Sequence, residues 1–274
     1  IRRPDRSDPT RIYRRVPLGD LADLLLTDAR SRRDQPVGGA AMADPARSAL
    51  GADQRDWLLG ELSASTAAWR LWGNPSVLSP TFRPEVTEDL IEPLRKLKLM
   101  HPDERAVDQD QWDGYPAERD AILAHVAAEE IRDLVVLSGD IHVGMALDVH
   151  RDPFAAAEAG APPLAVELVT ASLTSQNLDD KLGYGYGGSR AAQDRFVETF
   201  PHARWADFDG HGYVLVDVDH ERVEATWTFV DSVLEPNDDE FTAATFQVPR
   251  GRAELVAVID PLVRHVGVGG VSRR

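Results

Sequence analysis

The segment from residue 134 to residue 144 constrains the fold of this chain more than any other. Its four apolar residues at 134–137 include two β-branched valines, which is typical of a strand buried on both faces of a sheet. The strand runs into Gly139 and then into Asp140 and His142. Open α/β sheets bind their ligands at the carboxyl ends of the strands. The segment therefore predicts an α/β fold with a site where this strand ends.

Asp140 and His142 are two residues apart, so on an extended backbone their side chains point to the same side. A carboxylate and an imidazole that converge suit a hydrolytic metal ion, because both bind divalent and trivalent metals. Two ligands do not make such a site, which usually needs three or more. The same pattern fits an aspartate that caps its own turn, followed by a surface histidine. The residues themselves leave both interpretations open.

Composition excludes several classes of partner and chemistry. The chain has 274 residues, of which 43% are hydrophobic, so it is long enough to bury a sizeable core. Its formal net charge of -16 and pI near 4.9 argue against nucleic-acid binding and against an anionic membrane surface, because both would repel it. No apolar run is long enough to span a membrane. The absence of cysteine excludes disulfides, thiolate ligands and cysteine nucleophiles.

Three regions are expected along the chain. Residues 1–11 have no initiator methionine, no apolar stretch and no cleavage site, so they are interpreted as a linker cut from something longer and not as a signal peptide. Residues 12–250 contain the apolar and alternating segments of one domain. Residues 251–274 are expected to form a C-terminal extension with a loose end.

The order of the predicted elements indicates a mixed sheet. A helix over 117–131, with Pro116 at its start, leads into the strand at 134, and together with an earlier strand it forms a β-α-β unit with parallel strands. An antiparallel hairpin is expected later, because residues 212–219 and 223–230 alternate strictly around a short turn. The other expected elements are strands at 12–19, 21–28, 145–149 and 163–170, an extended segment at 68–79, and helices at 50–62, 90–100 and 189–200.

Charged residues also follow the buried strand at 21–28, in the run from Asp28 to Asp34. Such a run is often a solvated loop with local salt bridges. Its position just past a buried strand is the same as that of Asp140, and this favours a site. Arg30 and Arg33 are three residues apart and could form a fork for phosphate oxygens, a geometry that suits arginine better than lysine.

One further histidine is a candidate site residue. His211 precedes Gly-Tyr at the start of a predicted strand and could approach a metal or the substrate, so it is a candidate substrate-binding residue. His125, within a helix, and His220, in the hairpin turn, are expected to be surface residues. Trp112 and Tyr115 are expected to pack at the rim of the site.

Several segments, in this order, resemble the C-terminal half of the PhoD-type alkaline phosphatase/phosphodiesterase family, a branch of the metallophosphoesterases. Each segment is weak evidence alone, and their joint order and spacing carry the resemblance. They are residues 12–14 with 19–21, 27–34, 50–54 with Trp57 and Leu58, 111–115, 136–142, 169–172 and 211–213, and they span nearly the whole chain.

The resemblance implies a four-layer αββα sandwich with metals at the strand ends, here an incomplete C-terminal half with mixed sheets. It implies that Asp140 and His142 are metal ligands. It also implies that the loop from Asp28 to Arg33 lies beside the phosphate, with Asp28, Arg30 and Arg33 as catalytic residues and the two arginines as substrate-binding residues.

The same resemblance implies further properties of the whole enzyme. Iron and calcium are the implied metals, a small phosphate monoester or diester is the implied substrate, and the periplasm or the extracellular space is the implied location. The family's other metal ligands lie in an N-terminal half that this sequence does not show. The chain is therefore expected to depend on that half.

Three hypotheses about function remain. The first is a metal-dependent phosphoesterase, or the C-terminal part of one, and the second is a truncated, non-catalytic α/β module that binds a partner. The third is a carboxylate-based hydrolase that pairs Asp140 with Asp28 or Asp113. Metal dependence separates the first from the third, and turnover separates the first from the second. A serine hydrolase is not favoured, because no Gly-x-Ser-x-Gly motif occurs.

Overall fold

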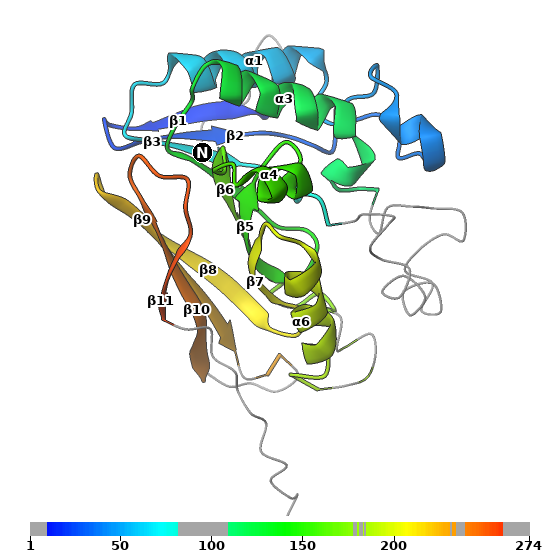
Figure 1. Ribbon diagram of the computed structural model, residues 1–274, viewed down its shortest axis with the longest axis vertical. Helices are drawn as coiled ribbons and strands as arrows, with labels where there is room; N and C mark the ends of the chain where they lie inside the picture. The colour runs from blue at the N-terminus through cyan, green and yellow to red at the C-terminus, as the bar shows by residue number, and fades with distance from the viewer. Residues whose placement is uncertain are drawn as a thin grey trace, which may run out of the picture.

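The computed structural model of the protein describes residues 10–81, 109–177, 180, 183, 185–230, 232–233 and 239–259. These residues form two sheets and a set of helices (Figure 1). The strands are β1 Arg14–Leu18, β2 Ala22–Leu26, β3 Trp69–Gly73, β4 Leu134–Ser138, β5 Gly144–Val149, β6 Ala165–Val169, β7 Ala203–Asp207, β8 His211–Val218, β9 Arg222–Val230, β10 Glu240–Pro249 and β11 Val256–Ile259. The helices are α1 Ala52–Ala64, α3 Pro116–Ala128, α4 Pro153–Ala159 and α6 Arg190–Thr199, with short 3-10 turns η1 Gly39–Ala43 and η2 Trp112–Gly114.

The larger sheet has seven strands in the order β1-β2-β3-β4-β6-β5-β7. Strands β2, β3, β4 and β6 are parallel to one another, whereas β1 and β5 run antiparallel to their neighbours. The four parallel strands place their carboxyl ends at one edge of the sheet. This confirms the predicted α/β class with a mixed sheet, and it puts β4 in the middle of that sheet.

The smaller sheet is an antiparallel meander in the order β11-β10-β9-β8. The predicted hairpin is confirmed, since β8 and β9 pair throughout their length. Asp219 closes the turn between them, because its side chain accepts hydrogen bonds from the backbone N–H groups of Glu221 and Arg222 at 2.7 and 2.8 Å.

Helices α1 and α3 cover one face of the larger sheet, and the smaller sheet covers the other (Figure 1). The described residues thus form an αββ stack, which is part of the expected αββα sandwich. Trp227 of β9 ties the two sheets together: its ring lies 5.1 Å from that of Trp205, and its indole N–H donates to the Val169 carbonyl at 2.9 Å. Burial of such aromatic side chains supplies much of the stability of a core.

Most expected elements are present, with ends shifted by a few residues. The helix expected at 90–100 lies outside the described residues. Helix α4 and strands β7 and β10 were not predicted as separate elements. No helix in the described ranges is both long and apolar enough to cross a membrane.

Candidate functional site

The central strand β4 ends at Ser138, and the backbone turns sharply just after it. Asp140 and His142 have φ angles of 74° and 64°, in the left-handed region that side chains with a Cβ rarely adopt. The expectation that both residues lie on an extended backbone was therefore wrong. The extended alternation ends before Asp140, and a turn presents the two side chains. Strained backbone of this kind persists where the surrounding structure enforces it, often at functional sites.

The His142 ring is oriented by one hydrogen bond. Its Nδ1 lies 2.8 Å from the carbonyl oxygen of Gln176, in the loop that follows β6. A carbonyl can only accept, so Nδ1 carries the proton, and in the neutral ring Nε2 keeps its lone pair. Nε2 has no hydrogen-bond partner among the described residues. A ring held through Nδ1–H to a carbonyl, with Nε2 free, is the usual arrangement of a metal-binding histidine.

Asp140 has one occupied and one free carboxylate oxygen. Its Oδ2 accepts a hydrogen bond from Gln111 Nε2 at 2.9 Å and forms an ion pair with the Arg30 guanidinium. Its Oδ1 has no hydrogen bond within the ranges that the structure describes. The alternative of an aspartate that caps its own turn is not what the geometry shows, since Arg30 and Gln111 both come from distant segments of the chain.

Two arginines from the loop after β2 contact a second acidic residue, Asp110. Arg33 donates to the Asp110 carbonyl at 3.0 Å and to its carboxylate at 2.9 Å. Arg30 donates to the same carboxylate at 3.1 Å, so it bridges Asp110 and Asp140. Burial lowers the pKa of the Arg30 guanidinium, but the two carboxylates outweigh this effect and raise it overall. The structure thus brings together Arg30, Arg33 and Asp140, which are far apart in sequence.

Asp28 plays a different part from the two arginines. Its carboxylate accepts hydrogen bonds from the backbone N–H groups of Arg30 and Ser31 at 2.9 and 3.0 Å, and from the Ser31 hydroxyl. Burial raises the pKa of Asp28, and these hydrogen bonds more than compensate, so the pKa is lowered overall. Asp28 is almost fully buried, and its hydrogen bonds hold the backbone of the loop from Asp28 to Arg33, called the arginine loop below.

His211 begins β8 and is held by a carboxylate. Its Nε2 lies 3.0 Å from Asp180 Oδ2, and its Nδ1 is buried without a hydrogen-bond partner in the described part of the chain. Residues 172–177 after β6 connect His211 to the site, because the Ser172 carbonyl accepts from the N–H of Gly212 at 2.9 Å and the Gln176 carbonyl accepts from His142. No hydrogen bond or ion pair among the described residues joins His211 directly to Asp140 or His142.

The donor set suits a metal ion only in part. The free Asp140 Oδ1 and His142 Nε2 are a carboxylate oxygen and an imidazole nitrogen, which fit a hydrolytic metal. Within residues 10–81, 109–177 and 185–230 and the shorter described stretches, no group of three or more His, Cys, Asp or Glu side chains is arranged to hold a metal. The described residues therefore offer a half-site.

The third hypothesis, a pair of catalytic carboxylates, finds little support in the geometry. Asp113 accepts from both the N–H and the hydroxyl of Thr81, at 3.0 and 2.8 Å, and Asp28 is occupied by its own loop. Trp112 and Tyr115 are fully buried packing residues. Sequence reasoning missed Asp110 and Gln111, which hold Arg30 and Asp140 in place. Gln111 entered the sequence analysis only within residues 111–115, as part of the family resemblance, without a role for its side chain.

Comparison with known proteins places these observations in a family. Alkaline phosphatase D of Bacillus subtilis (strain 168) is 26% identical to the chain over 278 residues, which cover 96% of this chain and 41% of that protein. A solved structure titled "Structure of PhoD" superimposes with a TM-score of 0.75 at 23% identity and covers 94% of this chain and 46% of that one. This likeness shows a shared fold.

The chain thus spans less than half of the length of these relatives. The model of the PhoD-like phosphatase family matches residues 1–227, which is most of the sequence. The matched region includes the arginine loop, the turn after β4 and His211. The chain belongs to the PhoD-like phosphatase family.

Proposed function

We propose that this chain takes part in the metal-dependent hydrolysis of phosphate monoesters or diesters, with Asp140 and His142 as metal ligands. One observation carries the proposal. The strained turn after β4 presents two donor atoms, Asp140 Oδ1 and His142 Nε2, that have no partner among the described residues. Family membership supports phosphoester chemistry in general.

The residues of the chain have distinct proposed roles. A hydrolytic metal, when bound, activates water and offsets the charge of the phosphoryl group. Arg30, whose side chain is 41% exposed, would bind phosphate oxygens, since its guanidinium is held at the site by Asp110 and Asp140. Arg33 is only 14% exposed and fixes Asp110, so we assign it a positioning role. His211, held by Asp180, is proposed to contact the substrate.

The proposal includes ligands from beyond these residues. Two donors do not complete a hydrolytic site, and the chain covers 41% of Alkaline phosphatase D. We propose that the remaining ligands come from an additional N-terminal segment like that of the longer relatives. Iron and calcium are the proposed metals, and an exported location is proposed, both on the family resemblance alone.

The first test measures bound metal. The purified chain is incubated with excess iron, calcium, zinc or manganese, desalted, and analysed by inductively coupled plasma mass spectrometry. We expect about one ion per chain, and we expect it to be lost in the double variant Asp140→Asn, His142→Ala. Asp120→Asn is a matched control, because Asp120 pairs with Arg151 on the exposed face of α3. Equal metal content in the wild type and the double variant would refute the half-site.

The second test measures turnover of p-nitrophenyl phosphate and bis-p-nitrophenyl phosphate, which separates monoester from diester hydrolysis. Where turnover is measured, by this chain alone or together with the additional segment, Arg30→Lys should lower kcat/KM by roughly 10-fold to 100-fold, because lysine cannot make the paired hydrogen bonds of a guanidinium to a charged group. Metal binding without turnover would keep the metal site but exclude hydrolysis by this chain alone, which would favour the non-catalytic module.

A further inference from the structure

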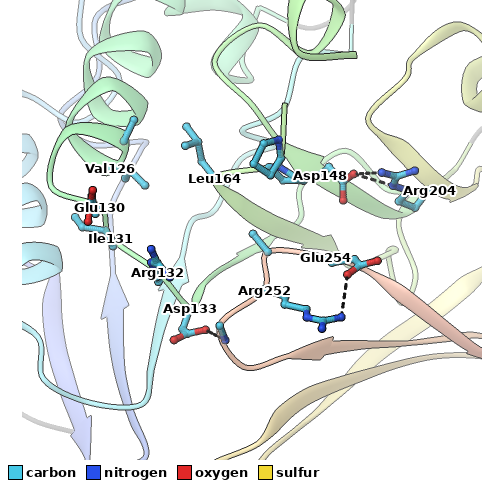
Figure 2. A pocket seen from close by; sticks show the side chains of 15 residues that line it. Val126, Glu130, Ile131, Arg132, Asp133, Asp148, Leu164, Arg204, Arg252 and Glu254 are labelled. Atoms are coloured by element: carbon cyan, nitrogen blue, oxygen red, sulfur yellow. Dashed lines mark hydrogen bonds and ion pairs between the residues drawn. The ribbon is translucent and has the colours of Figure 1, made fainter. Parts of the chain in front are cut away.

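A cavity of about 620 Å³ lies at the opposite end of the larger sheet from Asp140. It is bounded by the end of α3, by Pro162–Leu164 before β6, and by the loop from Gly251 to Glu254 before β11 (Figure 2). Residues of the phosphoesterase site do not line it. The volume is in the range of pockets that bind small organic molecules.

The feature that points to a ligand is a buried carboxylate with a free oxygen. Asp148 of β5 is 1% exposed and lines the cavity. One of its oxygens, Oδ2, accepts from Arg204 Nε and Nη2 at 2.7 and 2.5 Å. The other, Oδ1, is buried and has no hydrogen-bond partner among the described residues. A buried acceptor left unpaired costs about 1–3 kcal/mol, so a donor at this position would be stabilising.

The walls of the cavity fit a molecule with an apolar body. Val126 and Ile131, from the end of α3 and the turn after it, line the side of the cavity across from Asp148, and Leu164 lies between them in this view (Figure 2). One hydrogen bond joins two of the walls: Asp133 accepts from the N–H of Gly251 at 2.5 Å and thereby ties the loop before β11 to the start of β4.

The charges favour a cationic head group over an anionic one. Four carboxylates line the cavity, from Glu130, Asp133, Asp148 and Glu254, against the guanidinium groups of three arginines. The closest of these arginines to Asp148 is Arg204, which occupies only Oδ2. Oδ1 is itself buried, so a ligand ammonium group would reach it through a small movement of the side chains around it, without displacing Arg204 from Oδ2. The strongly acidic chain would not repel such a cation.

We propose that this cavity binds a small organic amine, whose ammonium group donates to Asp148 Oδ1 and whose apolar body packs against Val126, Ile131 and Leu164. The site is separate from the phosphoesterase site and does not depend on the proposed function. A hydroxyl could also donate to Oδ1, but it would gain nothing from the excess of carboxylates.

Binding is tested by isothermal titration calorimetry with three probes of one shape: cyclohexylmethylamine, cyclohexylmethanol and cyclohexanecarboxylate. We expect saturable binding of the amine with one site per chain, binding of the alcohol at least 10-fold weaker, and no binding of the carboxylate. Equal binding of amine and alcohol would refute the cationic head group. No saturable binding of the amine would refute the site.

Two variants locate the bound probe. Asp148→Asn should weaken amine binding at least 10-fold. Because this change also disturbs the ion pair with Arg204, a second variant, Ala127→Phe, places a ring in the mouth of the cavity from an exposed position of α3. Ala128→Phe is its control, since Ala128 is also exposed and does not line the cavity. Amine binding that is unchanged in Ala127→Phe would place the probe elsewhere and overturn the proposal.

Discussion

The buried histidine His202 makes the stability of the fold depend on pH. The side chain is 1% exposed, its Nε2 donates to the Pro80 carbonyl at 3.0 Å, and its Nδ1 is buried without a partner among the described residues. Burial, together with a smaller effect of the nearby Arg119 guanidinium, lowers the pKa of the imidazole to about 3. Arg119 is itself buried and donates to three backbone carbonyls.

The direction of the effect follows from proton linkage. In the unfolded chain the His202 pKa returns to its ordinary value of 6.5, so below that pH the unfolded state binds a proton that the folded state does not. Stability is therefore lost as the pH falls from 6.5 toward 3. One pKa unit corresponds to about 1.4 kcal/mol, so between pH 7 and pH 5 the free energy of unfolding should fall by about 2 kcal/mol from this one group.

The substitution His202→Gln isolates this contribution, because the glutamine amide can still donate to Pro80 but does not titrate. Urea unfolding at pH 7, 6 and 5 should show that the wild type loses about 2 kcal/mol more than the variant between pH 7 and 5, or about 1 M in the urea midpoint at an m value of about 2 kcal/mol/M. His220→Gln, at a half-exposed position, is the control and should follow the wild type. Parallel curves for wild type and His202→Gln would refute the reasoning.

Two further substitutions test close packing and buried hydrogen bonds. Gly212→Ala should destabilise the fold by about 3 kcal/mol, because the added Cβ would overlap the Thr228 carbonyl oxygen across the β8–β9 pair. Gly185→Ala is the control and should change the thermal stability much less, because a Cβ at Gly185 meets no atom within 4 Å. Equal losses of thermal stability in the two variants would contradict this prediction. Glu167→Gln should cost about 2–3 kcal/mol in chemical denaturation, because the buried carboxylate accepts from the N–H groups of residues 78 and 79 and from the Ser138 hydroxyl, and an amide cannot accept at both ends. A loss no larger than that of the exposed Glu158→Gln would count against it.

The sequence predicted those parts of the fold that depend on local pattern. The apolar run before Ser138 identified β4, the proline at the start of α3 marked that helix, and strict alternation marked the β8–β9 hairpin. Each of these signals lies within one segment of the chain. The α/β class followed, because a helix between two buried strands favours a parallel crossover.

One of the elements that were not predicted, helix α4, does have recognisable signals in its sequence. Helix α4 has Asp152 as its N-cap, accepting from the N–H groups of Phe154 and Ala155, Pro153 in its first turn, and the left-handed Gly160 at its end. Those residue types are the standard start and stop signals of a helix. Strand β7 offered no such signal, because four of its five residues are buried and its sequence does not alternate.

The arrangement of the site could not be predicted from local pattern. Arg30 and Asp140 are 110 residues apart, and only the parallel order of β2, β3 and β4 brings their loops to the same edge of the sheet. The left-handed backbone at Asp140 and His142 was missed because neither residue is glycine. The local sequence pattern predicts that the strand continues through residues 140 and 142. The turn is instead accompanied by contacts of their side chains with Gln111 and Gln176, which only the tertiary structure brings close.

The left-handed turn after β4 also limits how residues 140 and 142 can vary in sequence. Asparagine and glycine tolerate such a backbone, whereas valine or isoleucine would be strained there. In a deep mutational scan, variants at these two positions should therefore fall into two groups that differ in protein abundance. Asparagine and glycine would keep the protein abundant in cells, β-branched residues would reduce its abundance, and a scan that selects for metal binding would reject both groups. If residues 140 and 142 bind a metal as proposed, the backbone and the metal therefore restrict the same two positions in different ways.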